Sequence, residues 1–479
     1  MLSKKVDTNR PDTPDPDLAP LHASRALNSP VPRYQLADDE MSPRAAYQLI
    51  HDELALDGNP LLNLASFVTT WMEPEADKLL AETLSKNSVD EDEYPQTVEI
   101  QRRCVNIVAR LFHAPEANQY VGTPTIGSSE AIHLGGLALK WRWRTRRQAS
   151  GLPAERPNLV MGANVQVVWE KFCRYFEVEP RYVPCAEGRY VLGVEEALPL
   201  VDGNTIGVVG ILGSTYTGEF EPIKELNDAL EELNAEKGWD VPIHVDAASG
   251  GFVAPFAYPD LEWDFRLPLV KSINASGHKY GLVYPGVGWV VWRDQSDLPE
   301  ELIFHVNYLG GDQPTFNLNF SRAAGQIIAQ YYNFLRLGRA GYTAIMRSLL
   351  DLADHLADAI DGTEHFEVIG RGDNLPVVCF RLEDGCRFTA YEISDGLRAR
   401  GWIVPAYTMP KDIETMTVLR VVVRESLSRD LCDSLVEDLD RVVGRLDRLA
   451  DQGAEPEPFQ ARPTGAGPGS PTTGQHGIC

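Results

Sequence analysis

The sequence predicts an α/β fold in which helices cover a mostly parallel sheet, followed by a smaller α+β unit. Three apolar runs, at 204–212, 241–251 and 286–292, are typical of strands that are buried on both faces. Between the first two runs lies 223–238, which has the apolar periodicity of an amphipathic helix and ends at Gly238. This order of strand, helix and strand indicates a parallel sheet, whose ligands bind at the carboxyl ends of the strands.

The predicted smaller unit follows a long helical segment at 338–360. In it, strand-like stretches at 374–382 and 417–426 flank a helix-like stretch at 389–401. We therefore predict four parts: an N-terminal segment 1–60, a large domain 61–349, a small C-terminal domain 350–451 and a flexible tail 452–479. The first 30 or so residues, rich in Pro and Asp, are expected to be disordered.

Composition and charge exclude several classes of partner. The 44 basic and 69 acidic side chains among 479 residues give a net charge of −25, which argues against nucleic acid. No apolar stretch reaches the roughly 20 residues of a membrane span. The tail has no basic amphipathic helix, so we expect no calmodulin partner. The seven scattered cysteines lack CxxC spacing, so we expect no metal site, no disulfide framework and a cytoplasmic location.

A carboxylate at the end of a predicted buried strand is the first candidate for chemistry. Asp246 ends the apolar run of "IHVDAASGG" and is followed by small residues. An isolated Asp of this kind is most often a helix cap or a member of a salt bridge. The functional alternative is a carboxylate that pairs with the protonated nitrogen of a flat ring, which the small residues beside it would allow to lie against the backbone.

The second candidate is the stretch "TPTIGSSEA", in which Gly127, Ser128 and Ser129 precede a helix-like run. Free N–H groups and two hydroxyls at a helix start can bind a phosphate. Simple capping of the helix by a serine is the commoner explanation of such a motif.

The third candidate is "SINASGHKYG", which places Ser276, His278 and Lys279 together among small residues. A solvated surface lysine is the ordinary interpretation. A lysine with a phosphate-binding turn and a buried Asp instead indicates pyridoxal phosphate, whose aldehyde bonds to a lysine amine and whose ring acts as an electron sink.

The sequence as a whole resembles the glutamate decarboxylases, which are group II pyridoxal-phosphate decarboxylases of fold type I. The resemblance rests on stretches from about 34 to 450, including "LNLASFVTTW" (62–71), "EYPQTVEIQRRCVNIVARLFHAP" (93–115), "HVDAASGGFVAPF" (244–256), "NYLGGDQPTFNLNFSR" (307–322) and "RGWIVPAYTMP" (400–410). It implies a seven-stranded, mostly parallel sheet in the large domain. It also implies that L-glutamate is decarboxylated to 4-aminobutanoate and carbon dioxide, with one proton consumed.

The resemblance implies a role for individual residues as well. Lys279 resembles the Schiff-base lysine, and Asp246 the partner of the ring nitrogen. The other expected cofactor contacts are Ser128, Ser129, Gln166, Thr215, Ala248, Ser276 and His278, together with Ser321 from a neighbouring subunit. The expected substrate contacts are Ser66, Phe67, Arg420 and a neighbouring subunit's Asp90. Because Ser321 and Asp90 would come from a neighbouring subunit, the resemblance implies at least a homodimer, with a hexamer as a larger possibility.

Arg420 and Arg424 lie in "TVLRVVVRES", where period-two alternation puts them on one strand face. Arg420 matches the arginine that holds the α-carboxylate. For Arg424 a structural ion pair or a side chain that reaches solvent is the better interpretation. Three departures from the family stand out: Ser66 replaces a common threonine, Glu170 replaces a histidine of some bacterial relatives, and His476 lies in a tail whose role stays open.

Two other functions compete with this one. A decarboxylase for an aromatic amino acid or aspartate would share the fold, but Ser66, Phe67 and Asp90 argue against it. A non-catalytic relative would not need Lys279, Asp246 and Arg420 together.

Overall fold

The computed structural model describes residues 34–115, 121–307, 311 and 313–453. The chain divides into two compact units, Met1–Leu62 and Asn63–Cys479. In the first unit, helix α2 (Pro43–Leu54) is capped by Ser42, whose hydroxyl accepts a hydrogen bond from the N–H of Ala45. The predictions for the first 30 or so residues, for 454–479 and for His476 lie outside the described residues.

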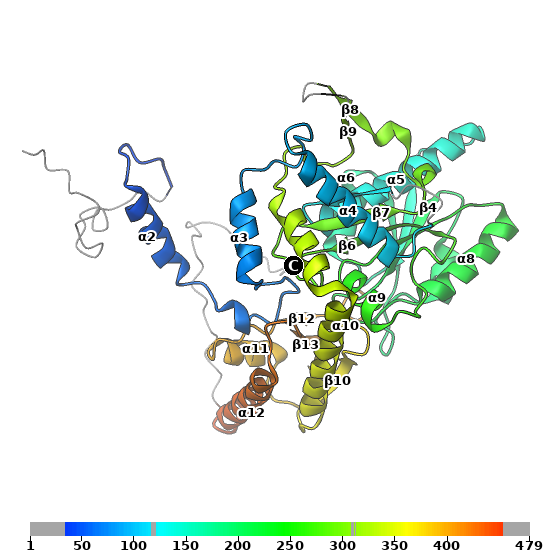
Figure 1. Ribbon diagram of the computed structural model, residues 1–479. Helices are drawn as coiled ribbons and strands as arrows, with labels where there is room; N and C mark the ends of the chain where they lie inside the picture. The colour runs from blue at the N-terminus through cyan, green and yellow to red at the C-terminus, as the bar shows by residue number, and fades with distance from the viewer. Residues whose placement is uncertain (1–33, 116–120, 308–310, 312, 454–479) are drawn as a thin grey trace, which may run out of the picture. The chain divides into compact units, whose positions relative to one another are not determined.

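A seven-stranded sheet forms the centre of the second unit (Figure 1), with the strand order β1-β7-β6-β5-β4-β2-β3. Its strands are β1 (Val121–Thr125), β2 (Asn158–Gly162), β3 (Glu179–Val183), β4 (Thr205–Ile211), β5 (Ile243–Asp246), β6 (Val270–Ser276) and β7 (Gly288–Trp292). Strands β2 to β6 pair in parallel, whereas β7 runs antiparallel to both β6 and β1. The predicted seven-stranded, mostly parallel sheet is therefore confirmed.

Four elements match their predicted ranges closely. Strands β4, β5 and β7 fall inside the apolar runs, and helix α8 (Ile223–Lys237) ends where Gly238 takes the left-handed conformation. Glycine adopts this conformation without a steric penalty, which is why the sequence marks the helix end so well.

Helices cover both faces of this sheet. Val290 and Trp292 of β7 pack in one core cluster with residues of α5, whereas the indole N–H of Trp289 faces the other way and donates to Gln330 of α10. The helices of this part of the unit are α3 (Pro74–Thr83), α4 (Pro95–Leu111), α5 (Ser128–Ala149), α6 (Val167–Tyr175), α7 (Val194–Ala197), α8 and α9 (Ala254–Ala257). Among the helices that the structure describes, none combines the length and the apolar character that crossing a bilayer requires.

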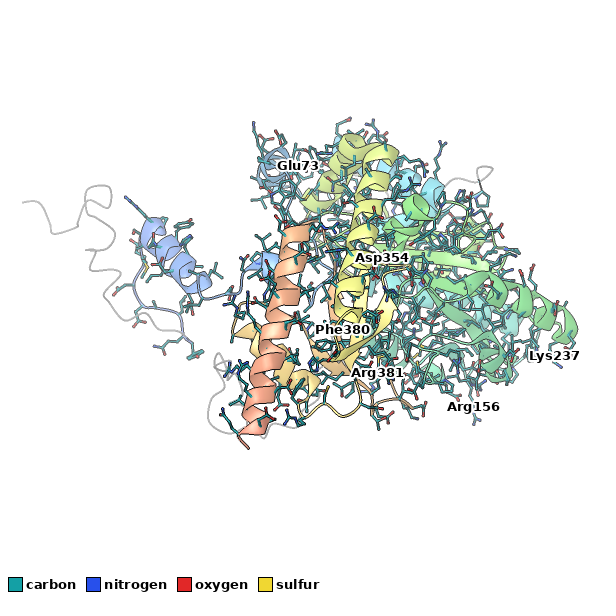
Figure 2. The ribbon with its side chains drawn as sticks, turned by 90° about the horizontal axis from the view of Figure 1, so that it is seen from below. Glu73, Arg156, Lys237, Asp354, Phe380 and Arg381 are labelled. Atoms are coloured by element: carbon teal, nitrogen blue, oxygen red, sulfur yellow. The ribbon has the colours of Figure 1, made fainter. Side chains whose placement is uncertain are left out.

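A second, four-stranded antiparallel sheet lies toward the C-terminus, with the order β10-β11-β13-β12. It consists of β10 (Phe366–Arg371), β11 (Val377–Leu382), β12 (Ala406–Thr408) and β13 (Thr417–Val422). Helix α10 (Gly325–Asp361) packs on β10 and β11 and lies beside α12 (Arg429–Asp451), as Figure 2 shows around Asp354 and Phe380. Helix α11 (Ala390–Arg398) and the hairpin β8 (Phe304–Val306) and β9 (Gln313–Thr315) complete the unit.

The long helix differs from its prediction in one respect. It begins at Gly325 rather than at 338, and Gly338 interrupts it with a non-helical backbone conformation. The sequence pattern detected only the part that follows this break.

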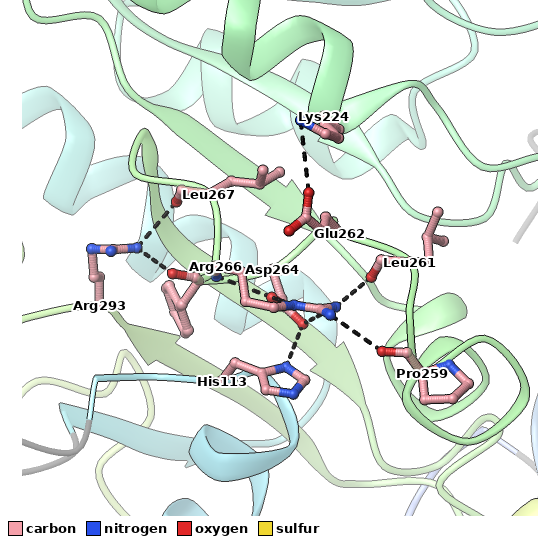
Figure 3. A network of polar contacts seen from close by, with 10 residues as sticks. His113, Lys224, Pro259, Leu261, Glu262, Asp264, Arg266, Leu267 and Arg293 are labelled. Atoms are coloured by element: carbon pink, nitrogen blue, oxygen red, sulfur yellow. Dashed lines mark hydrogen bonds and ion pairs between the residues drawn. The ribbon is translucent and has the colours of Figure 1, made fainter.

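A buried carboxylate anchors the connection from β5 to β6 (Figure 3). Asp264 accepts hydrogen bonds from Nε of Arg266 at 2.8 Å and lies 2.8 Å from Nδ1 of His113, just beyond α4. Arg266 also donates to the carbonyls of Pro259 and Leu261. This network fixes the loop that precedes β6, and β6 ends at the candidate site.

Candidate active site

A cavity of about 750 Å³ opens where β4, β5 and β6 end. Ile211, Asp246 and Asn274 are register partners on these three strands, so the side chains that follow them converge at one edge of the sheet. The cavity is lined by eleven of the fourteen predicted site residues: Ser66, Phe67, Ser128, Ser129, Gln166, Thr215, Asp246, Ala248, Ser276, His278 and Lys279.

Lys279 reaches into this cavity from the turn after β6. Its Nζ donates to the hydroxyl of Ser249 at 3.1 Å and lies 5.2 Å from the centre of the Phe67 ring. Burial, opposed by the charge of Asp246 and aided by that of Arg420, lowers the pKa of Lys279 to about 8. An amine with this pKa is available as a nucleophile near neutral pH, so the solvated surface lysine is the wrong interpretation.

Asp246 is 6% exposed and accepts three hydrogen bonds from neutral donors. Its Oδ2 accepts from the indole N–H of Trp169 at 2.9 Å, and its Oδ1 accepts from Asn274 Nδ2 at 3.0 Å and from the N–H of Ala248 at 3.1 Å. Three donors stabilise an ionised carboxylate in a buried place. Asp246 also lines the cavity, so its carboxyl group can meet a cation there.

The start of α5 forms another wall of the cavity. Gly127 is the N-cap residue and no side chain caps the helix, so the alternative in which a serine only caps it is wrong. The hydroxyl of Ser128 instead lies 2.7 Å from that of Ser276. The first N–H groups of a helix together with two hydroxyls form an anion site.

His278 stands beside this anion site. A Cβ at Gly127 would meet Cε1 of His278 at 3.2 Å, so only glycine leaves this space open. Within the described residues, Nδ1 of His278 is buried and has no hydrogen-bond partner. Burial and the charge of Lys279 lower the pKa of His278 to about 4, so the imidazole is neutral.

Arg420 is buried directly behind the cavity wall rather than among its lining residues. It donates to the carbonyls of Thr215 and Ala65, and its guanidinium carbon lies 5.0 Å from the centre of the Phe67 ring. Its Nε has no hydrogen-bond partner among the described residues.

Arg424 is 1% exposed, so the interpretation that its side chain reaches solvent is wrong. It donates to the carbonyls of Asn63 and Val68, both at 2.6 Å. Both arginines therefore hold the segment 63–70, which carries Ser66 and Phe67.

Asp90 and Ser321 are not among the lining residues of this chain's cavity, and Glu170 is exposed on α6. Asp90 lies in the turn before α4, and its N–H donates to the carbonyl of Asn87. Nδ2 of the same Asn87 approaches the Ser321 hydroxyl at 3.4 Å. The two residues that were expected to act in a neighbouring subunit thus lie close to one another.

Comparisons with known proteins now give the family. Residues 33–383 match the pyridoxal-dependent decarboxylase conserved domain. Glutamate decarboxylase 5 of Arabidopsis thaliana is 59% identical over 91% of this chain and 88% of its own length. Glutamate decarboxylase beta of Listeria innocua is 50% identical over 90% of this chain and 93% of its own length. The chain belongs to the glutamate decarboxylases.

A solved glutamate decarboxylase, that of Lactobacillus brevis, superimposes with a TM-score of 0.87 and 47% identity over 90% of this chain and 99% of its own. The predicted family and fold are therefore confirmed. As a glutamate decarboxylase, the chain uses pyridoxal phosphate to convert L-glutamate to 4-aminobutanoate and carbon dioxide.

The cavity fits this cofactor. The anion site at Ser128 and Ser276 suits its phosphate, and the buried carboxylate of Asp246 suits a protonated ring nitrogen. The amine of Lys279 suits its aldehyde. The unpartnered Nδ1 of His278 beside Gly127 is a further polar atom that a bound group can satisfy.

Sequence reasoning missed four residues at the site. Trp169 and Asn274 donate to Asp246, Ser249 accepts from Lys279, and Asn164 lines the cavity. A signal existed for Trp169, because it follows Gln166 by three residues, the spacing at which helical side chains are neighbours. A signal existed for Asn274 too, because it lies on the same strand face as Ser276.

Proposed function

We propose that Lys279, Asp246 and Arg420 carry the decarboxylation of L-glutamate in this chain. Lys279 holds the cofactor through its amine, and Asp246 keeps the ring nitrogen protonated. When bound, pyridoxal phosphate supplies an electron-accepting ring that stabilises the charge left when the carboxyl group departs. The observation that carries this proposal is the placing of a buried amine, a buried carboxylate and a helix-start anion site around one cavity.

Ser128, Ser129, Ser276 and His278 hold the phosphate, and Gln166, Thr215 and Ala248 surround the ring in this proposal. Gln166 is well suited to a fixed position, because its Oε1 caps α6 by accepting from the N–H of Val168 at 2.7 Å. A side chain fixed by its own backbone contact loses little freedom when a ligand binds.

Arg420 binds the α-carboxylate of the substrate and so decides which bond at Cα is broken. Its Nε supports this role, because no described residue accepts from it and a buried donor without a partner favours an incoming acceptor. Ser66 and Phe67, with Asp90 of a neighbouring subunit, bind the distal carboxylate. Two carboxyl groups that meet must share a proton, so this contact favours acidic pH.

The proton that returns to Cα comes from Lys279 or His278. Lys279 is the better donor at neutral pH, because its pKa of about 8 leaves it largely protonated whereas His278, with a pKa of about 4, is not.

We also propose that the protein is at least a homodimer, with a hexamer as the larger alternative, and that it acts in the cytoplasm without calmodulin. The pairing of the Asp90 and Ser321 segments supports a shared site. The N–H of Ser88 donates to the carbonyl of Arg322 at 2.8 Å, so the segments that carry Asp90 and Ser321 lie side by side.

The test is the release of carbon dioxide and 4-aminobutanoate from L-glutamate by the cofactor-loaded protein, from about pH 4 to about pH 8. Lys279→Ala should release neither product, while the exposed Lys411→Ala should match the wild type. A wild type that releases product from L-aspartate or an aromatic amino acid in preference would contradict the assigned roles of Ser66 and Phe67.

A further inference from the structure

Four polar residues beneath the cavity form a square on one face of the central sheet. His244 and Asp246 alternate on β5, and Ser272 and Asn274 alternate on β6. The register pairs His244 with Ser272 and Asp246 with Asn274. Trp169 of α6 joins the square, with its ring 5.2 Å from that of His244 in an edge-to-face arrangement. His244, Asn274 and Trp169 are fully buried.

The hydrogen bonds of this square run in one direction. Asn274 Nδ2 donates to Asp246, so its Oδ1, 2.8 Å from Nε2 of His244, must accept the proton of that nitrogen. Burial lowers the pKa of His244, so the ring is neutral and its Nδ1 must accept from the Ser272 hydroxyl at 2.7 Å. Ser272, His244 and Asn274 therefore donate in sequence toward the carboxylate.

Asp246 and His244 together favour this direction. An amide can be turned by half a rotation with little change in shape, and a turned Asn274 would present its oxygen to the oxygen of Asp246. With its proton on Nε2, His244 opposes this turn as well, because a turned amide would set two donors against one another. Trp169 adds a second donor that cannot be turned, since an indole N–H only donates.

We propose that His244, Asn274 and Trp169 are positioning residues that hold the Asp246 carboxylate through a fixed set of donated hydrogen bonds, so that the proton between it and the cofactor ring stays on the ring nitrogen. The inference rests on the proposed role of Asp246. Each lost donor makes the carboxylate a stronger base, which draws the proton away from the ring. A ring without that proton is a weaker electron acceptor. The titratable groups coupled to Asp246 by charge are Glu221, His244 and Lys279.

The test is the ¹⁵N NMR shift of the ring nitrogen in holoenzyme loaded with ¹⁵N-labelled pyridoxal phosphate. Trp169→Phe and His244→Phe should move this shift toward that of unprotonated pyridine. Each should lower kcat about tenfold and leave KM little changed, because the loss concerns the reacting ring rather than substrate binding. His244→Gln keeps an N–H donor and should restore part of the shift.

Trp289→Phe is the matched control. Trp289 is another fully buried tryptophan, and its N–H donates to Gln330 rather than to Asp246. It should leave the ring shift unchanged. If His244→Phe fails to fold, Trp169→Phe and His244→Gln still test the inference.

Two results would overturn the inference, and they are distinguishable. If Asp246→Asn changes the ring shift while Trp169→Phe and His244→Phe do not, the positioning role is wrong and the role of Asp246 stands. If Asp246→Asn also leaves the shift unchanged, the proposed pairing of Asp246 with the ring fails as well.

Discussion

Two neighbouring residues, His278 and Lys279, have pKa values that are lowered for the same reason. Burial disfavours the charged form of each, so the pKa of Lys279 falls to about 8 and that of His278 to about 4. Near neutral pH the pair therefore carries at most the charge of the lysine. A single cation next to the anion site is compatible with both phosphate binding and amine chemistry.

The lowered pKa of Lys279 predicts how the cofactor-free protein captures pyridoxal phosphate. The neutral amine is the reactive form, so the rate should rise with pH and reach half its maximum near pH 8. His278 is already neutral over this range and should add no second transition. The measurement is stopped-flow absorbance between about pH 6 and about pH 10. Nα-acetyl-lysine amide is the control, and a half-rise of the protein as high as that of this model amine would contradict the prediction.

Arg420 and Arg424 show how two arginines of one sequence run divide their contacts. Arg420 contacts Thr215 and Phe67 of the cavity wall, while Arg424 donates to Asn63 and Val68 in the segment that carries this wall. That segment also donates from Thr69 to the carbonyls of His278 and Lys279, so it links the small sheet to the lysine turn.

Replacing Arg424 should therefore disturb substrate binding from a distance. A lysine lacks the planar fork that reaches two carbonyls at once, so Arg424→Lys should raise the KM for glutamate about tenfold. It should also lower the free energy of unfolding by about 2 kcal/mol, because buried carbonyls lose a charged donor. Steady-state kinetics and urea unfolding test this. The control is Arg445→Lys at an exposed position. An unchanged KM in Arg424→Lys would show that Arg424 does not position Ser66 and Phe67.

At the scale of elements, the close approach of β7 to the start of α5 makes the anion site possible. Gly288 of β7 lies so near that an added Cβ would stand 2.5 Å from the carbonyl carbon of Gly127 and 2.8 Å from the N of Ser128. A contact this short forces the helix start away from the sheet. The position of the N–H groups that we propose to bind the phosphate thus depends on the absence of a side chain at Gly288.

Gly288→Ala should for this reason weaken cofactor binding at least tenfold, about the effect of losing one hydrogen bond to a charged group. Dissociation constants for pyridoxal phosphate measured by fluorescence titration test this expectation. Gly444→Ala, inside α12, has space for a methyl group and should instead leave cofactor affinity unchanged and raise the melting temperature. Equal cofactor affinity in Gly288→Ala and the wild type would contradict the argument.

At the scale of the whole molecule, the cavity of one chain contains eleven of the predicted site residues, while Asp90 and Ser321 lie together elsewhere on its surface. The proposed homodimer explains both facts if each subunit lends this surface element to its neighbour. A shared site makes activity depend on assembly as well as on the fold of each chain.

Complementation between inactive variants tests the shared site. Lys279→Ala removes the amine of its own cavity, and Ser321→Trp should block the cavity of the neighbouring subunit. Random pairing of the two variants should restore about a quarter of wild-type activity, because half of the dimers are mixed and each mixed dimer has one intact site. The two parents, assayed alone, are the controls. No recovery in a mixture whose mixed dimers are verified by mass spectrometry would place Ser321 in its own subunit's site.

The sequence by itself determined the fold class, the family and eleven of the residues that line the cavity. Buried strands and capped helices leave local patterns, as at β4, β5 and Gly238, because periodicity and glycine conformation depend on neighbouring residues only. The reactive groups lie at strand ends and at a helix start, where the sequence also marks them. Asp246, Ser128 and Lys279 were recognisable for this reason.

Only the tertiary structure decided which groups support these residues. The side-chain donors to Asp246 come from α6 and β6. Arg424, which holds the segment 63–70, lies more than 350 positions away from it. The space beside His278 depends on the absence of a side chain at Gly127. Such contacts join segments that are distant in the chain, so no local pattern encodes them. They arise from strand order and register, which place His244, Asn274 and Trp169 beneath the cavity.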